Sequence, residues 1–124
     1  MKNIFHRHGE CFGIPLFKFG RYYIELWFCK SGYSVEEHFH QMQDNKIIFL
    51  FGSRVTFFKR FFSLENEERV LLNFKDIFKS FRIPLGCYHR FINNGKWPFV
   101  FINVARFYYN FNPISASKDF KTTI

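Results

Sequence analysis

Short segments rich in phenylalanine and β-branched residues recur along the chain, and turn-forming residues separate them about every ten positions. Aromatic residues make up 23% of the sequence, and phenylalanine alone contributes 21 residues. Such residues favour the pleated, half-buried surface of a β-sheet. Many short strands joined by turns are typical of a β-sandwich or a β-barrel. We therefore expect an all-β fold with almost no helix.

At 124 residues the chain is long enough for one domain with a core of its own. We assign this domain to residues 14–110, with an N-terminal lead-in or edge strand at 1–13 and a C-terminal tail at 111–124. Residues 43–45 are expected to form a turn because of their polar, turn-favouring types. Residues 76–81 fit one helical turn as well as a strand. The strands are expected at 14–19, 22–30, 35–41, 46–51, 54–62, 69–74, 88–92 and 97–107.

The net charge of +8 is spread singly and in pairs along the sequence, which favours a solvated surface over one specific anion-binding face. The cysteine count of three is odd and includes no Cys-x-x-Cys spacing, so we expect a reducing compartment and no disulfide framework. Charged and polar residues at 6–10 interrupt any signal peptide. The longest apolar run, 47–51, is too short to span a bilayer. These features predict a cytoplasmic protein that does not enter a membrane.

Two histidines, His38 and His40, lie one residue apart in an expected strand. Side chains alternate across a strand, so these two imidazoles share one face. A carboxylate, Asp44, follows, and a third histidine, His89, comes directly after a Pro-x-Gly turn. Neutral imidazoles with a nearby carboxylate are ligands that first-row transition metals accept. The residues therefore predict a metal site, without saying what the metal does.

The spacing of these residues resembles the two motifs of the cupin superfamily. The first motif is a glycine, five residues, His-x-His, three or four residues, a glutamate, six residues and a glycine; the chain has Gly32, His38, His40, Asp44 and Gly52. The second motif is a glycine, five residues, Pro-x-Gly-x-x-His, three residues and an asparagine; the chain has Pro84, Gly86, His89 and Asn93. The chain departs from the pattern in three places. Asp44 replaces glutamate, Gly52 comes one residue late, and Phe78 stands where the second motif begins with glycine.

The resemblance, which covers residues 32–93, implies a double-stranded β-helix, or jelly-roll barrel, with a metal inside. It implies one divalent transition metal, with Fe(II) expected first and Mn, Ni or Zn as alternatives. The implied ligands are His38, His40 and His89. Asp44 is one methylene shorter than the usual glutamate, so it ligates directly, through water or not at all.

Four further residues are candidates for the wall of the pocket: Glu36, Gln43, Cys87 and Phe91. Glu36 and Gln43 could also substitute for Asp44. Glu36 would share a face with His38 unless the strand is locally irregular. Cys87 would share a face with His89, although a small buried residue explains it equally well.

Three functions remain open. Three imidazoles leave coordination positions free, which suits an enzyme acting on a small ligand, and the basic charge allows that ligand to be an anion. The resemblance implies dioxygenation first and isomerisation next. The second function is a non-catalytic cupin that binds a ligand or serves as a structural homodimer; we expect a homodimer in either case.

The third function is a single-stranded nucleic-acid-binding barrel. It would use the interleaved aromatic and basic residues at 54–62 and 75–82, with rings stacking on bases and cations contacting phosphates. No RNA-binding signature accompanies these residues. We therefore expect their aromatic rings to fill the barrel or an interface, and we do not expect nucleic acid as a partner.

Overall fold

The computed structural model describes residues 6–8, 11–39, 43–60, 67–107 and 121–122, and of these the side chains of 11–35, 43–60 and 67–107. No helix within this part of the chain is long and apolar enough to cross a membrane. The elements, in order, are β1 (His6–His8), β2 (Cys11–Phe19), β3 (Tyr22–Cys29), β4 (Ser34–Phe39), β5 (Gln43–Phe51), β6 (Val55–Arg60), β7 (Glu68–Leu72), the 3-10 helix η1 (Phe74–Asp76), β8 (Ser80–Ile83), β9 (Tyr88–Asn93), β10 (Phe99–Phe107) and β11 (Lys121–Thr122).

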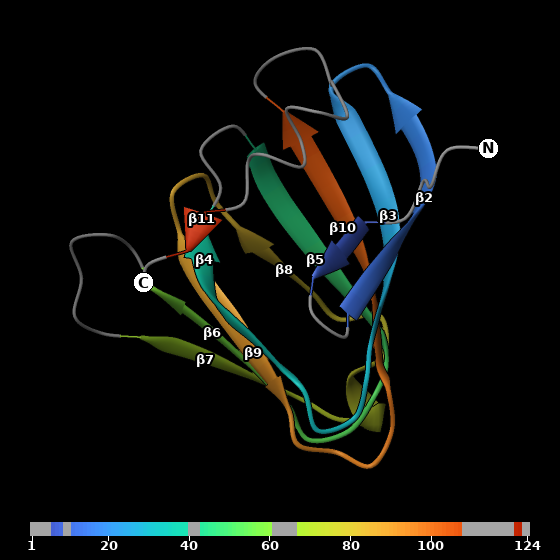
Figure 1. Ribbon diagram of the computed structural model, residues 1–124, viewed down its shortest axis with the longest axis vertical. Coiled ribbons are helices and arrows are strands. Elements are labelled where there is room, and N and C mark those ends of the chain that lie inside the picture. The colour runs from blue at the N-terminus through green and yellow to red at the C-terminus, as the bar shows by residue number, and fades with distance from the viewer. Residues whose placement is uncertain (1–5, 9–10, 40–42, 61–66, 108–120, 123–124) are drawn as a thin grey trace.

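The strands form two antiparallel sheets that face each other (Figure 1). One sheet has six strands in the order β1-β2-β3-β10-β5-β8, and the other has five in the order β11-β4-β9-β6-β7. The late strands β10 and β9 each pair between two strands that come much earlier in the sequence. This arrangement of two packed sheets is that of a jelly roll.

β5 begins earlier than the sequence indicates. The turn expected at residues 43–45 is wrong, because β5 starts at Gln43 and pairs with β10 from that residue onward. From Asn45 onward the strand also pairs with β8 on its other side. Pairing on both edges outweighs the preference of Asp44 and Asn45 for turns, since strand propensity depends strongly on context.

Three other regions also contain a strand or a helix among the described residues. In the expected tail at 111–124, residues Lys121–Thr122 form β11, which pairs antiparallel with β4. In the ambiguous region near 76–81, the 3-10 helix Phe74–Asp76 is followed by β8. At N-terminal residues 1–13, an edge strand, β1, pairs with the start of β2.

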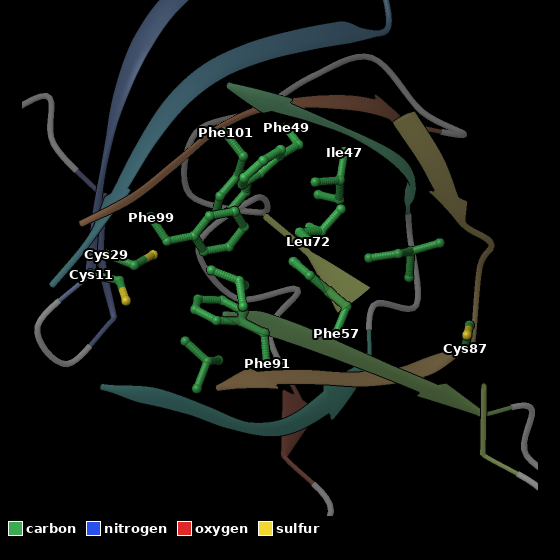
Figure 2. Close-up of a cluster of buried hydrophobic side chains, with 13 residues drawn as sticks. Cys11, Cys29, Ile47, Phe49, Phe57, Leu72, Cys87, Phe91, Phe99 and Phe101 are labelled. Carbon is green, nitrogen blue, oxygen red and sulfur yellow. The ribbon is translucent and has the colours of Figure 1, made fainter. Parts of the chain in front are cut away.

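A block of aromatic rings packs between the two sheets (Figure 2). Phe49, Phe99 and Phe101 project from the six-stranded sheet towards Phe57 and Phe91 of the five-stranded sheet. Ring centroids of Phe91 lie 5.1 Å from those of both Phe57 and Phe99. Each such side chain, when buried, stabilises the fold by about 1.5–3 kcal/mol. The expectation that Phe57 fills the barrel is confirmed.

Both sheets change from aromatic to polar residues at the same level of the barrel. The Phe91 and Phe101 rings are in contact across the two sheets, with centroids 6.1 Å apart. The next inward position after Phe91 on β9 is the buried His89, and the next after Phe101 on β10 is Asn103. Glu25 pairs with Asn103 across β3 and β10 and is also buried. At this level, polar side chains of β3, β9 and β10 therefore follow the aromatic block.

Candidate metal and ligand site

His89 is held inside the barrel with a defined ring orientation. The side chain is buried, and its Nδ1 atom lies 3.0 Å from the carbonyl oxygen of Cys87. A carbonyl oxygen can only accept, so Nδ1 carries a proton and donates it; in the neutral ring the lone pair is then on Nε2. Metal-ligating histidines commonly have this arrangement, in which one ring nitrogen donates to a backbone carbonyl and the other binds the metal.

His38 lies directly opposite His89 in the pairing of β4 with β9. Residues directly opposite in an antiparallel pair have Cβ atoms about 4.5–5.5 Å apart. The strand pairing thus brings two of the three expected ligand positions together from distant parts of the sequence. The third, His40, lies outside the described residues.

A register shift interrupts β4 just before His38. The paired positions advance from Val35 to His38 on β4, but only from Phe91 to His89 on β9. One extra residue on β4 makes this a β-bulge, a feature that re-aims the residues around it. The alternative that the strand is locally irregular at Glu36 is therefore confirmed, and simple alternation does not place Glu36 relative to His38.

Asp44 and its two neighbours occupy different environments. Gln43 and Asn45 are buried, at 6% and 4% exposed, whereas the intervening Asp44 is only half-buried, as alternation on a strand requires. The Asp44 carboxylate accepts a hydrogen bond of 2.6 Å from the backbone N–H of Leu85. This hydrogen bond connects β5 to the turn that precedes β9.

Asn45 is an inward residue of β5 that the sequence did not predict as part of the site. Its Oδ1 and Nδ2 atoms are buried and have no hydrogen-bond partner within the described part of the chain. The cupin motif allows four residues after the second histidine, and that spacing selects Asn45 instead of Asp44. It also leaves six residues before Gly52, the number that the motif requires. Asn45 was not predicted as a site residue because it is not a carboxylate and lies in the turn expected at 43–45.

Glu25 forms a second polar centre, on the inner face of β3. The Trp27 indole N–H lies 3.4 Å from its Oε1, and Tyr23 and Asn103 also hydrogen-bond the carboxylate. Burial raises the pKa of Glu25 to about 7, and the three hydrogen bonds offset part of that rise. Burial, followed by the charge of Glu25, raises the pKa of Tyr23 as well. A carboxyl group with a pKa near neutrality is a frequent feature of functional sites.

Two other pocket candidates lie in the hydrophobic core. Cys87 is fully buried, and its thiol contacts the carbonyl of Tyr88 at 3.6 Å. Burial raises the pKa of the Cys87 thiol, so the thiolate is disfavoured, as expected for a small packing residue. Phe91 belongs to the aromatic block. The three cysteines are buried, and Figure 2 shows Cys87 far from Cys11 and Cys29.

The aromatic-basic segment of β6 makes its contacts within the protein. Phe57 packs in the core. Phe58 is nearly buried, and the guanidinium groups of Arg90 and Arg69 lie over its ring, at 3.8 and 5.4 Å from the centroid. Arg90 also pairs with Glu67 at 3.4 Å. These rings are thus covered by protein groups.

Among the side chains that the structure describes, no three of His, Cys, Asp or Glu gather closely enough to hold a metal. That set excludes the side chains of His38 and His40. The donors that can be assessed fit the expected metal: Nδ1 of His89 donates to a backbone carbonyl, as in metal-ligating histidines, and the Asn45 amide, which has no partner among the described residues, is buried in the same interior.

No protein-family model and no curated protein matches the sequence, but solved structures do. The capsular polysaccharide assembling protein CapF from Staphylococcus aureus matches with a TM-score of 0.76 and 17% identity, over 95% of this chain and 33% of that one. The CENP-C cupin domain of Drosophila melanogaster matches with a TM-score of 0.64 and 13% identity, over 82% and 69%. A protein from Klebsiella pneumoniae with a double-stranded β-helix domain matches at 0.59 and 15%, over 82% and 80%.

These likenesses define the class of fold. The chain folds as a cupin-type jelly roll, or double-stranded β-helix, and the fold expected from the sequence is confirmed. The chain spans about a third of the length of the CapF chain that it matches.

Proposed function

We propose that the protein is a ligand-binding cupin that holds one divalent transition metal at His38, His40 and His89. The observation that carries this proposal is the buried His89, whose Nδ1 donates to the Cys87 carbonyl while His38 lies opposite it in the strand pairing. Imidazole nitrogen suits Fe(II), the metal proposed first, and also Ni and Zn, with Mn as a further candidate. When bound, the metal would offer open coordination positions to a ligand.

Asn45, not Asp44, is the residue of β5 that we assign to the site. Asn45 is buried with both polar atoms of its amide unpaired among the described residues, whereas Asp44 holds the backbone of Leu85. The neutral amide oxygen of Asn45 would replace the glutamate of the family motif. The site would then contain three neutral imidazoles and no carboxylate ligand.

The reaction that this site would support is dioxygenation or isomerisation of a small molecule, in a cytoplasmic homodimer. Three imidazoles leave room for a ligand beside the metal, as such chemistry requires. Glu25, with a pKa near 7, would exchange a proton with a ligand close to neutral pH.

A second candidate function is a non-catalytic interaction module. The exposed aromatic side chains of Phe17, Phe19 and Tyr22 at the β2–β3 hairpin favour it, because contiguous exposed apolar residues often mark protein interfaces. The comparison agrees, since one similar structure is the Drosophila CENP-C protein bound to CAL1. Turnover of a small molecule that requires the metal would separate the first function from the second.

Elemental analysis of untagged protein tests the metal site. We expect one metal per chain in the wild type and its loss in the His38→Ala/His89→Ala double variant. The matched control is His6→Ala/His8→Ala, which removes the other His-x-His pair in the sequence and should leave the metal content unchanged. Metal-free wild-type protein that also resists reloading with Fe(II), Mn, Ni and Zn would overturn the proposal.

A further inference from the structure

Large apolar side chains are exposed at the lower end of the barrel in Figure 1, where the β5–β6 loop, η1 and the β9–β10 loop meet. We call them the end patch; its members are between 36% and 76% exposed and comprise Phe51, Phe74, Ile77, Phe78 and Trp97. The ring centroid of Phe51 lies 5.2 Å from that of Phe74 and 6.1 Å from that of Trp97. Neighbouring exposed apolar side chains often mark an interaction surface.

Hydrogen bonds between the loops support the end patch. The side chain of Asn73, which precedes η1, accepts from the backbone N–H of Arg54 at 2.9 Å. The carbonyl of Arg54 accepts in turn from the N–H of Asn94 at 3.1 Å, and the carbonyl of Trp97 accepts from Nδ2 of Asn93 at 3.0 Å. The rings are therefore exposed on a surface of connected loops.

Phe78 exposes its ring in a strained backbone conformation. Its φ is +72°, a left-handed value that bulky residues rarely adopt and glycine adopts readily. The cupin motif has glycine at this position. The backbone N–H of Phe78 donates to the carbonyl of Phe49 at 2.7 Å, which helps to fix the conformation. Since the Phe78 side chain is 76% exposed, packing does not explain why a strained position carries a large ring.

Basic residues accompany the rings. Lys75, Lys79 and Lys96 are each next in sequence to an aromatic residue of the end patch, and they are exposed, as is Arg54. The carboxylate of η1, Asp76, is buried and pairs with Lys79 at 2.9 Å. Arg54, at φ +54°, is the one other non-glycine residue with positive φ in the described part of the chain. The end patch therefore combines exposed rings, exposed cations and both strained residues.

The charges and the ring geometry select the kind of partner. A second copy would bring the same cations face to face, and like charges across an interface oppose binding. Single-stranded nucleic acid needs ring faces on which its bases stack. Phe51, Phe74 and Trp97 instead meet at steep angles of 60°, 85° and 70°, so each ring covers part of another.

An anionic bilayer satisfies both parts of the end patch at once. Its headgroups supply negative charge, and the apolar layer begins directly beneath them. Aromatic rings are favoured at the level of the headgroups, and lysine side chains extend from that level to the phosphates. Alternating rings and lysines, as in Phe74-Lys75 and Phe78-Lys79, fit such a boundary.

We infer that the end patch docks the protein on the surface of an anionic lipid bilayer. The expectation that the protein does not enter a membrane rested on the lack of a signal peptide and of a long apolar run, and surface binding needs neither. Docking at this end does not depend on the metal site of the proposed function, because Asn45 lies about 20 Å from Phe51 along β5.

Co-sedimentation of the full chain with vesicles tests the inference. One set of vesicles is phosphatidylcholine alone, and the other contains about one third phosphatidylserine. Each Lys or Arg close to an anionic surface strengthens binding about fivefold, so we expect at least tenfold tighter binding to the anionic vesicles. Salt should weaken that binding. No binding to the anionic vesicles, or equal binding to both kinds, would overturn the inference.

Trp97 reports whether the end patch makes the contact. Of the two tryptophans, Trp97 is exposed, whereas Trp27 packs against the core. Anionic vesicles should shift the tryptophan emission to shorter wavelength as Trp97 leaves water. Trp97→Phe should remove this shift but keep most of the binding, because phenylalanine retains an apolar ring. A shift that persists in Trp97→Phe would place the contact elsewhere and contradict the inference.

Variants assign the binding to individual residues. Phe78→Gly should weaken vesicle binding about fivefold, because it removes an apolar ring from the interface. It should not lower the melting temperature, since glycine adopts the φ of this position readily. Phe19→Ala is the control, because it removes a ring that is 75% exposed from the β2–β3 hairpin and should leave binding unchanged. Lys75→Ala/Lys96→Ala should weaken binding at least tenfold.

The same variants identify a different occupant if the inference is wrong. Protein that ignores anionic vesicles but binds an oligothymidine strand, with loss in Phe78→Gly, would overturn the inference and assign the end patch to nucleic acid. A dimer in sedimentation velocity that Phe78→Gly dissociates, again without vesicle binding, would overturn it in favour of a second copy. Vesicle binding that Phe19→Ala abolishes and Phe78→Gly leaves intact would also contradict the assignment.

Discussion

His38 and His89 lie opposite each other where β4 pairs with β9, although 50 residues, including strands β5 to β8, separate them in the sequence. The register that joins them depends on the bulge that follows Val35, because a strand with one residue fewer would shift His38 out of the pair. The metal site that we propose therefore depends on the whole barrel having closed.

The first prediction concerns pH and the metal. Metal binding requires neutral imidazoles, whose usual pKa is about 6.5, so metal occupancy should fall as the pH drops below roughly 6. Dialysis at a series of pH values, followed by elemental analysis, measures the metal occupancy. Occupancy that stays constant down to about pH 4 would exclude histidine ligation.

The second prediction tests whether Asp44 has a structural role, as acceptor of the Leu85 N–H, or is a metal ligand. Asp44→Ala should lower the free energy of unfolding by about 1 kcal/mol, because it removes the acceptor of the Leu85 N–H. The metal affinity should change little, since we assign Asn45 to the site. Urea unfolding and zinc titration measure the two quantities. A large loss of zinc affinity with unchanged stability would show that Asp44 is a ligand.

The third prediction follows from Glu25, whose pKa burial raises from its usual 4.5 to about 7. Below about pH 4.5 the carboxyl group is protonated in the folded and the unfolded chain, and its contribution to stability is complete. As the pH rises towards 7, the unfolded chain ionises first, so the free energy of unfolding falls, by up to about 3 kcal/mol. Above that pH the contribution is constant.

Glu25→Gln should remove this part of the pH dependence. The measurement is the difference in unfolding free energy between wild type and variant at pH 4.5 and at pH 7.5. We expect wild type to lose stability relative to the variant between these values. Two parallel pH profiles would mean that Glu25 is not protonated in the fold at neutral pH.

The fourth prediction concerns the aromatic block. Phe57→Ala should destabilise the protein by about 3–5 kcal/mol, because Phe57 is 2% exposed and packs against other rings of the block. Phe78→Ala is the matched control: Phe78 is 76% exposed, so the change should stay within about 0.5 kcal/mol. Chemical denaturation measures both. Equal losses in the two variants would contradict the placement of the core.

The sequence predicts this fold well because the pattern that encodes it is local. Aromatic runs such as the one in β3, broken by turns, indicate strands directly. The start of β5 was missed because Asp44 and Asn45 favour turns locally, and only pairing with β10 and β8 makes them a strand. β8 and β10 lie far from β5 in the sequence, so the types of neighbouring residues alone could not predict this pairing.

The candidate site was predictable only in part, for a related reason. His38 and His89 stand out by type and spacing, and the structure pairs their positions. The sequence does not predict Glu25 as a site residue, because a single glutamate among aromatic residues is usually expected to face the solvent. Its burial follows from the register of β3 with β10, which places it beside Asn103.

Long-range ¹H–¹⁵N NMR of the histidine side chains tests the central claim most directly. In metal-free protein, His89 should be the neutral tautomer with its proton on Nδ1, as its bond to the Cys87 carbonyl requires. Zinc should then shift Nε2 of His89 together with ring nitrogens of His38 and His40, and leave His6 and His8 unchanged. A proton on Nε2 of His89, or zinc shifts confined to His6 and His8, would contradict the account.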